Sequence, residues 1–154
     1  MQPYKTPISV LVVIYTQQGE VLLLERADSM GAWQSVTGSV EADETLLQTA
    51  AREVFEETGL IASEHFLSDS QQHNYYEIYA QWRHRYAPEV THNTEHVFAL
   101  QLNNARPNIG NEQPIILSPR EHLNYQWLMW QDAALKVFSP SNRAAILQLA
   151  REHA

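Results

Sequence analysis

Three glutamates in the first half of the chain have the spacing of a shared helical face. Glu53, Glu56 and Glu57 are three and four residues apart, which would place neighbouring Cβ atoms about 5–6 Å apart in a helix. Like charges at this spacing repel one another, and acids near a helix C-terminus also oppose the helix dipole. A solvated helix face is the simple alternative. A bound divalent cation would turn each of these repulsions into an attraction, so the spacing favours a metal site.

The helix that would carry these acids has recognisable ends. Thr45 and Gln48 form a predicted capping box at its start, with Asp43 as the competing N-cap residue. Gly59 occupies the position after the helix where a left-handed conformation is common. Glu57 borders the apolar side of this helix, so the acidic face should begin at the edge of the buried side. The apolar side is predicted to consist of Leu47, Ala50, Ala51 and Val54.

The rest of the chain supplies strands and further helices that would position this segment. Apolar and alternating patterns predict strands at residues 8–15, 20–26, 33–37, 61–70, 95–102 and 123–128, the first of them buried on both faces. Residues 75–86 are ambiguous between strand and helix, and residues 103–112 read as a surface loop. Two final helices are expected at residues 130–137 and from about residue 141 to residue 152. This order predicts an α/β (α+β) sandwich with a mixed central sheet.

Composition narrows the classes of function. A chain of 154 residues is expected to form one domain, residues 1–154, with a substantial core. Its net charge of −8 argues against non-specific binding to nucleic acid. Cysteine is absent, which excludes disulfides and thiol chemistry and suits a cytoplasmic location. The apolar run at residues 8–15 is too short for a membrane span, so no membrane association is expected, and the oligomeric state stays open.

The segment from Gly38 to Leu60 resembles the signature of a known family, the Nudix box. Its defining positions are all filled by the expected residues, namely Gly38, Glu44, Arg52, Glu53, Glu56, Glu57 and Gly59. The resemblance extends to the strands around the box and implies a Nudix α/β/α sandwich. It also implies hydrolysis of a phosphoanhydride with Mg²⁺ as the cofactor, for which Mn²⁺ is a possible substitute.

The resemblance also implies roles for individual residues. The implied metal ligands are all oxygen donors: Glu53, Glu56, Glu57, Glu121 and the carbonyl group of Gly38. Either Glu56 or Glu121 could instead serve as the general base, and the sequence does not decide between them. Arg52 belongs to the same catalytic set, because pairing with Glu44 or Glu56 would hold the acids in place.

The segment that leads into the box and several segments after it resemble one branch of the family, which acts on dihydroneopterin triphosphate in the folate pathway. They are residues 33–41, 83–88, 93–95, 121–123 and 141–143. The implied substrate-binding residues are Lys5, Arg26, Thr37, Tyr76, Glu77, Ile78, Tyr79 and Ser139. Lys5 and Arg26 would meet phosphate oxygens. A tyrosine of this set would stack on the pterin ring, and Glu77 would accept hydrogen bonds from its N–H groups.

Two alternatives remain beside this interpretation. The first is a Nudix enzyme with another small-molecule substrate, such as a damaged nucleoside triphosphate or a dinucleoside polyphosphate. The second is a binding module without catalytic activity, built on a decayed Nudix domain. Decay should remove acids from the box, and none is missing here, which argues against the second alternative.

Overall fold

The computed structural model describes residues 4–103 and 115–153. Its strands are β1 (Ile8–Tyr15), β2 (Glu20–Arg26), β3 (Trp33–Gln34), β4 (Val36–Ser39), β5 (Phe66–Glu77), β6 (His92–Gln101) and β7 (His122–Met129). Its α-helices are α1 (Leu46–Thr58), α2 (Trp130–Lys136) and α3 (Pro140–Glu152), and two 3₁₀ helices are η1 (Ala62–Glu64) and η2 (Ala80–Arg85). Most of the loop predicted at residues 103–112 lies outside the described residues.

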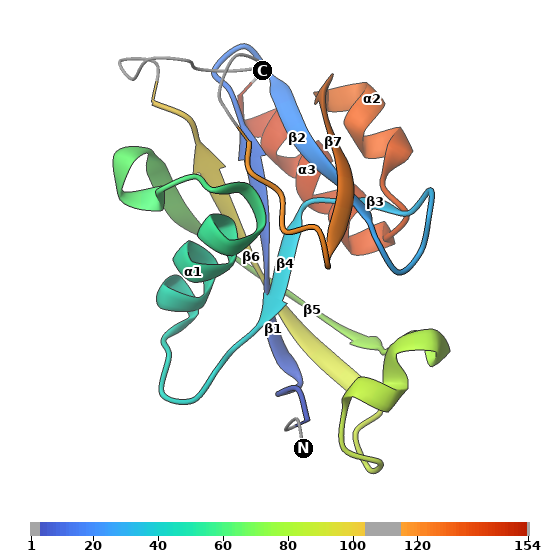
Figure 1. Cartoon of the computed structure of the whole chain (residues 1–154). Coiled ribbons are helices and arrows are strands. Elements are labelled where there is room, and N and C mark those ends of the chain that lie inside the picture. The colour runs from blue at the N-terminus through green and yellow to red at the C-terminus, as the bar shows by residue number, and fades with distance from the viewer. Residues whose placement is uncertain (1–3, 104–114, 154) are drawn as a thin grey trace.

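The strands form one mixed sheet in which β1 is central. The order is β3-β2-β1-β6-β5, with β4 also paired to β1 and β7 to β2 (Figure 1). The central strand runs parallel to β6, whereas it meets β2 and β4 in antiparallel fashion. Near Tyr15 it pairs with β2, and from Val12 back to Ser9 it pairs with β4 instead. The sheet therefore divides into two arms, one carrying β4 and the other carrying β2, β3 and β7.

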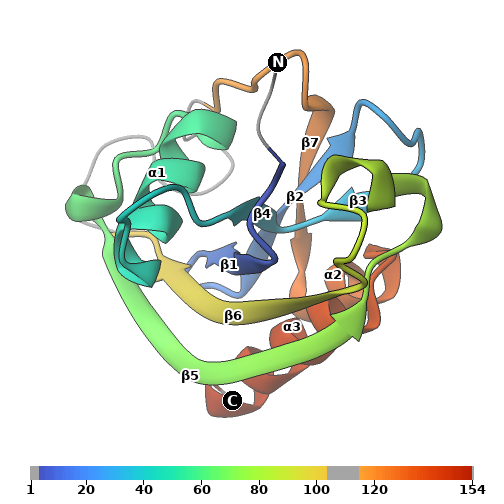
Figure 2. The same cartoon turned by 90° about the horizontal axis from the view of Figure 1, so that it is seen from below.

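Helices cover both faces of this sheet, which confirms the predicted sandwich. The helix α1 lies on one side, and α2 and α3 lie on the other (Figures 1 and 2). Successive residues of a strand point to opposite faces, so β1 contributes to two separate cores. Val10 and Val12 pack in the core that includes Val54 of α1, whereas Leu11 packs in the core that includes Ile146 of α3. The prediction that β1 is buried on both faces is confirmed.

The structure corrects two details of the prediction and decides one that the sequence left open. The helix turns Leu47 toward solvent with 52% of its surface exposed, and the neighbouring Leu46 packs on the core instead. Residues 61–65 contain η1 rather than a strand. The ambiguous segment at residues 75–86 divides in two, because β5 stays paired with β6 as far as Glu77, opposite His92, and η2 follows.

The expected strand at residues 33–37 is two short strands with different partners. The first, β3, pairs with β2, and the second, β4, pairs with β1. The chain thus crosses between the two arms of the sheet at Ser35, which is fully buried. Its backbone N–H donates to Oδ1 of Asn142 at 2.8 Å, and Nδ2 of Asn142 donates to the Ser35 hydroxyl at 3.0 Å. These bonds tie the start of α3 to the crossing point.

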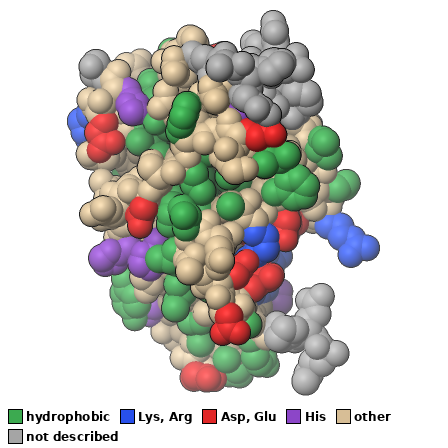
Figure 3. Space-filling view, turned by 90° about the vertical axis from the view of Figure 1, so that its left-hand side faces the viewer, with side chains coloured by type: hydrophobic (Ala, Val, Ile, Leu, Met, Phe, Trp, Pro, Cys, Tyr) green, Lys and Arg blue, Asp and Glu red, His purple; other side chains and the backbone are tan. Residues whose placement is uncertain are grey.

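The surface on the α1 side mixes apolar and charged groups. Figure 3 shows hydrophobic side chains gathered on this face, with acidic and basic side chains beside them. Leu47 and Phe55 are the strongly exposed apolar residues of α1 itself. Among the helices that the structure describes, none has the length and the apolar character needed to cross a membrane.

Candidate active site

The helix α1 begins and ends as its sequence predicts. The hydroxyl of Thr45 accepts a hydrogen bond from the Gln48 backbone at 3.1 Å, and the Gln48 side chain accepts one from the Thr45 backbone at 2.9 Å. The competing cap, Asp43, instead adopts a left-handed conformation in the preceding turn. Gly59 ends the helix with φ of 79° and donates to the carbonyl of Phe55. These caps fix the residues at which the helix begins and ends, as the sequence predicts.

The three acids of α1 lie in different environments. Glu57 and Glu53 are buried, with 1% and 7% of their surfaces exposed. The side chain of Glu56 is about half exposed. Burial and the neighbouring Glu53 carboxylate both raise the pKa of Glu56. The helix therefore presents a buried pair of carboxylates and a third at the surface.

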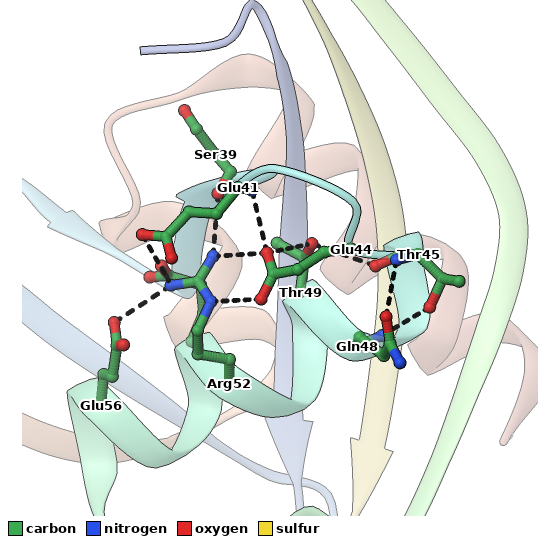
Figure 4. Close-up of polar contacts among 9 residues, drawn as sticks. Ser39, Glu41, Glu44, Thr45, Gln48, Thr49, Arg52 and Glu56 are labelled. Atoms are coloured by element: carbon green, nitrogen blue, oxygen red, sulfur yellow. Dashed lines mark hydrogen bonds and ion pairs between the residues drawn. The ribbon is translucent and has the colours of Figure 1, made fainter. Parts of the chain in front are cut away.

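Arg52 is the centre of an ionic network beside this pair (Figure 4). Its guanidinium donates to both oxygens of Glu44, at 2.6 and 2.9 Å, and to Glu53 at 2.6 Å. It also reaches Glu56 at 3.2 Å and the carbonyl of Ser39 on β4 at 3.0 Å. The two partners expected from the sequence, Glu44 and Glu56, are thus both present. Arg52 additionally fixes Glu53 and attaches α1 to β4.

Glu57 is a buried acid whose hydrogen-bonding capacity is incompletely used. Burial is the largest cause that raises its pKa well above the ordinary value, and a hydrogen bond and repulsion from Glu53 add to it. The backbone N–H of Thr37 acts in the opposite direction. Oε1 of Glu57 is buried without a hydrogen bond from any described residue, and Nε2 of His122 lies 3.7 Å from it. Two close acids and an unpaired buried oxygen are expected of a cation site.

Gly38 on β4 lies directly against Glu53. A Cβ atom built at this position would overlap the carboxyl group of Glu53, so the close approach requires glycine. Gly38 faces Val10 in the register of β4 with β1. The backbone of β4 and the carboxylates of α1 therefore meet at one place, although they come from different layers.

A cavity of about 770 Å³ opens beside these groups. Eleven of the residues predicted from sequence line it: Lys5, Arg26, Thr37, Gly38, Glu57, Tyr76, Glu77, Ile78, Tyr79, Glu121 and Ser139. Arg52, Glu53 and Glu56 lie outside this lining, behind or beside Glu57. Glu121 lies just before β7, and burial followed by repulsion from Glu53 raises its pKa. The structure thus brings two of the predicted acids, Glu57 and Glu121, to one cavity with the predicted substrate residues.

Basic side chains gather at one end of the cavity. Arg26 and Arg85 both bind Asp28, at 2.7 and 2.9 Å. Hydrogen bonding from Arg26 is the largest cause that lowers the pKa of Asp28 to about 2. Although Lys5 is exposed, desolvation by the cavity walls lowers its pKa, and repulsion from Arg85 adds to this effect. The charges of Arg26 and Glu121 also act on Lys5, so basic and acidic groups share this end.

Aromatic side chains line the cavity directly beside these basic groups, and Nε1 of Trp82 donates to Asp28 at 2.9 Å. Tyr79 and Trp82 meet edge to face with ring centroids 5.5 Å apart, and each lies 5.8 Å from Phe138. The guanidinium of Arg26 covers the Trp82 ring at 4.2 Å, so the basic and aromatic groups are in contact. Sequence reasoning did not find the roles of Asp28, Trp82 or Phe138. Nothing in their local patterns distinguishes them, because they come together only through tertiary contacts.

The sequence of this chain is similar to those of known proteins. A model of the NUDIX domain matches residues 5–149. The chain belongs to the Nudix family. Among its relatives, the dihydroneopterin triphosphate diphosphatase of Escherichia coli K12 is 47% identical over 148 residues, which cover 94% of this chain and 93% of that protein. The enzyme of the same description from Haemophilus influenzae is 40% identical and covers 95% and 89% of the two chains.

A solved structure supports the same assignment. The structure of the E. coli dihydroneopterin triphosphate pyrophosphohydrolase superposes with a TM-score of 0.86 at 45% sequence identity. The superposition covers 98% of this Nudix chain and 99% of that one. The likeness therefore includes the cavity walls and both helical layers as well as the Nudix box.

Nudix enzymes typically use a divalent metal ion, and the residues of this chain fit one. Oε1 of Glu57 is buried and unpaired, Glu53 lies beside it, and the absence of a side chain at Gly38 leaves room for Glu53. In residues 4–103 and 115–153, no three acidic or imidazole side chains already surround one point. Two carboxylates are nevertheless enough for Mg²⁺, which keeps several waters and takes further oxygens from substrate phosphates.

Proposed function

We propose that this protein hydrolyses dihydroneopterin triphosphate to dihydroneopterin monophosphate and pyrophosphate, a step toward folate, with Mg²⁺ as its cofactor. The observation that carries the proposal is the 47% identity with the E. coli dihydroneopterin triphosphate diphosphatase over 94% of this chain. An identity of this extent includes the segments that line the cavity as well as the box shared by all Nudix enzymes. Substrate choice depends on those segments, so this relative is the best guide to the substrate.

The acids of α1 would hold the metal. Glu53 and Glu57 are the ligands that the geometry favours, with the carbonyl of Gly38 as a third oxygen from β4. When bound, the ion would neutralise phosphate oxygens and lower the pKa of its water ligands. Arg52 would keep Glu53 in place through the bond at 2.6 Å and would balance the local negative charge.

Glu56 and Glu121 are the candidates for the general base. Each has a raised pKa, which improves a carboxylate as an acceptor of the proton from the attacking water. Glu121 lines the cavity, whereas Glu56 is bound to Arg52 at 3.2 Å, which weakens it as a base. We therefore favour Glu121 as the base and Glu56 as an outer ligand or a charge that supports the metal site.

The basic and aromatic side chains of the cavity would orient the substrate. Lys5 and Arg26 lie close enough to influence each other and Glu121, so both can contact the triphosphate next to the metal site. The pterin ring would then extend toward Tyr79 and its aromatic neighbours. Thr37 would support the metal site rather than bind substrate directly, because its amide interacts with Glu57 and its hydroxyl donates to the Val10 carbonyl at 3.0 Å.

The test is a comparison of substrates and of one matched pair of variants. Purified protein with Mg²⁺ is incubated with dihydroneopterin triphosphate, nucleoside triphosphates and dinucleoside polyphosphates, and the hydrolysis products of each are separated and quantified. We expect kcat/KM to be highest for the pterin, and a nucleotide preferred by about tenfold would refute the proposal. Glu57→Gln should lower activity by more than the roughly 10–100-fold that follows loss of a supporting group. Glu89→Gln, at an exposed position outside the cavity, is the control and should leave activity unchanged.

The cellular setting belongs to the same proposal. We propose that residues 1–154 act as one domain, in the cytoplasm, on a soluble triphosphate. Fractionation of cells that express the protein, with pyrophosphatase activity as the readout, tests the location. Activity that sediments with membranes would contradict it.

A further inference from the structure

A buried carboxylate lines the cavity on the face opposite α1 and has no part in the metal site. Glu95 of β6 is only 5% exposed. Asn74 of β5 and Ser141 of α3 donate hydrogen bonds to the same oxygen, Oε1, at 3.4 and 2.8 Å. In the part of the chain that the structure describes, no residue donates to Oε2 and no basic side chain forms an ion pair with Glu95. The protein therefore binds one oxygen of this carboxylate, Oε1, and leaves Oε2 available to a ligand in the cavity.

A second acceptor lies close by on the same strand. Asn93 is two residues before Glu95, so both side chains point to the same face of the sheet. Its Nδ2 donates to the Ser9 hydroxyl at 2.7 Å and to the Tyr76 hydroxyl at 3.1 Å. Its Oδ1 is buried and has no hydrogen-bond partner among the described residues. Buried polar atoms are rarely left unpaired, so two acceptors without donors at one cavity indicate a ligand rich in N–H groups.

The segment that holds Glu95 also carries part of the aromatic wall. Ser141, which binds Glu95, comes three residues after Phe138, which packs against Tyr79 and Trp82. The bonds between Asn142 and Ser35 fix this segment to the sheet. The cavity thus combines flat apolar side chains with a fixed row of acceptors, which suits an aromatic heterocycle that presents donors along one edge.

We propose that Glu95 recognises the heterocycle of the substrate by accepting hydrogen bonds from a ring N–H and an adjacent amino group. This edge, the 2-amino-4-oxopyrimidine edge, is present in pterins and also in guanine, whereas adenine places an acceptor nitrogen beside its amino group. The inference rests on the proposed function for the identity of the natural substrate. Glu77, which the sequence favours for this role, is 70% exposed and faces Arg83 at 3.8 Å, so it lies at the rim of the cavity.

The variant Glu95→Gln tests the assignment with little disturbance of the fold. Glutamine keeps an oxygen for Ser141 and Asn74, but it replaces the free oxygen by an N–H₂ group that opposes the donors of the ligand. We expect kcat/KM for dihydroneopterin triphosphate and for dGTP to fall about 10–100-fold, and that for dATP to change less than about threefold, because rejection is strong where a buried hydrogen bond is lost. Glu89→Gln removes the same charge outside the cavity and should change none of the three.

A binding measurement separates this inference from the proposed function. Dihydroneopterin monophosphate is titrated into wild type and Glu95→Gln without metal, and its fluorescence reports binding of the ring; the variant should bind at least about tenfold more weakly. Equal losses of activity on all three substrates, or unchanged pterin binding, would overturn the role of Glu95. If the wild type fails to hydrolyse dihydroneopterin triphosphate, the proposed function falls, and the contrast between dGTP and dATP still decides the role of Glu95.

Discussion

Replacement of Gly38 by alanine should lower activity strongly and change the stability of the fold little. The Cβ of an alanine at this position would overlap Cγ, Cδ and Oε2 of Glu53, and all three atoms belong to one side chain. The backbone at Gly38 does not have a positive φ, so alanine causes no strain there. Rotation of Glu53 relieves the overlap, and it moves the carboxylate away from Glu57 and from the place where β4 meets α1.

The expected effects follow from that rotation. A displacement of about 1 Å at a reacting centre can cost about 100-fold in rate. We therefore expect kcat/KM to fall about 100-fold, which corresponds to about 2.7 kcal/mol of transition-state stabilisation. The Mg²⁺ concentration needed for half-maximal activity should rise about tenfold, in the range seen when support for a ligand is lost. The free energy of unfolding in urea should change by less than about 1 kcal/mol, because most substitutions that avoid a fixed clash are mild.

Gly31→Ala is the matched control with the opposite pattern. Gly31 has φ of 83°, and a Cβ atom added there would have no other atom within 4 Å, so alanine is strained at this position but touches nothing. It should lose about 1–2 kcal/mol of stability and keep its activity, since a left-handed residue with a side chain costs about this much. Gly38→Ala with activity within about threefold of wild type would refute the need for Glu53 to lie against β4. A parallel loss of stability and activity in both variants would refute it as well.

Three further predictions concern the supports of the site. Arg52→Lys keeps the positive charge but loses the planar guanidinium that binds Glu44 and Glu53 together. We expect activity to fall about 10–100-fold. Because Glu53 is released, a Mg²⁺ titration of activity should show a higher requirement for the metal. Thr45→Ala removes the N-cap of α1 and should cost about 1 kcal/mol in urea unfolding with kcat/KM preserved; a loss of activity without a loss of stability would contradict this. The lowered pKa of Asp28, about 2 against an ordinary 3.8, means that its stabilisation is present above about pH 4 and disappears as the pH falls through 2. Between pH 5 and pH 2, Asp28→Asn should therefore lose less stability than wild type. The difference should be at most about 1 kcal/mol, because the ion pair with Arg26 is partly exposed to solvent. An equal loss of stability in both proteins would show that the ion pair contributes nothing.

Local features of the chain were predictable because they depend on neighbours in sequence. The caps of α1, the face shared by its acids and the burial of β1 all follow from periodicity and from the chemistry of single residues. The family follows from the box, because its residues belong to one continuous stretch of sequence, from Gly38 on β4 to Leu60 just after α1. The failures have a tertiary origin. The burial of Leu46 in place of Leu47 and the division of residues 75–86 depend on contacts with distant strands.

The acids of α1 show where prediction from sequence stops. Their spacing alone shows that Glu53, Glu56 and Glu57 share a face, but it does not show which of them is buried. The structure buries Glu53 and Glu57 because β4 crosses that side of the helix, and it leaves Glu56 in solvent beside Arg52. The register of β4 on β1, set by pairings far along the chain, decides this difference.

Helical spacing is a local property, so a set of acids suited to a metal ion and to phosphate chemistry can be recognised without knowledge of the fold. What those acids face depends on the packing of distant parts of the chain. The cavity joins residues from Lys5 to Ala144, and Glu95 is held by Ser141, which lies 46 residues away in the chain. The physical reason is that a side chain's burial, its partners and its free hydrogen-bonding atoms depend on how layers pack, and packing is settled by the whole chain at once.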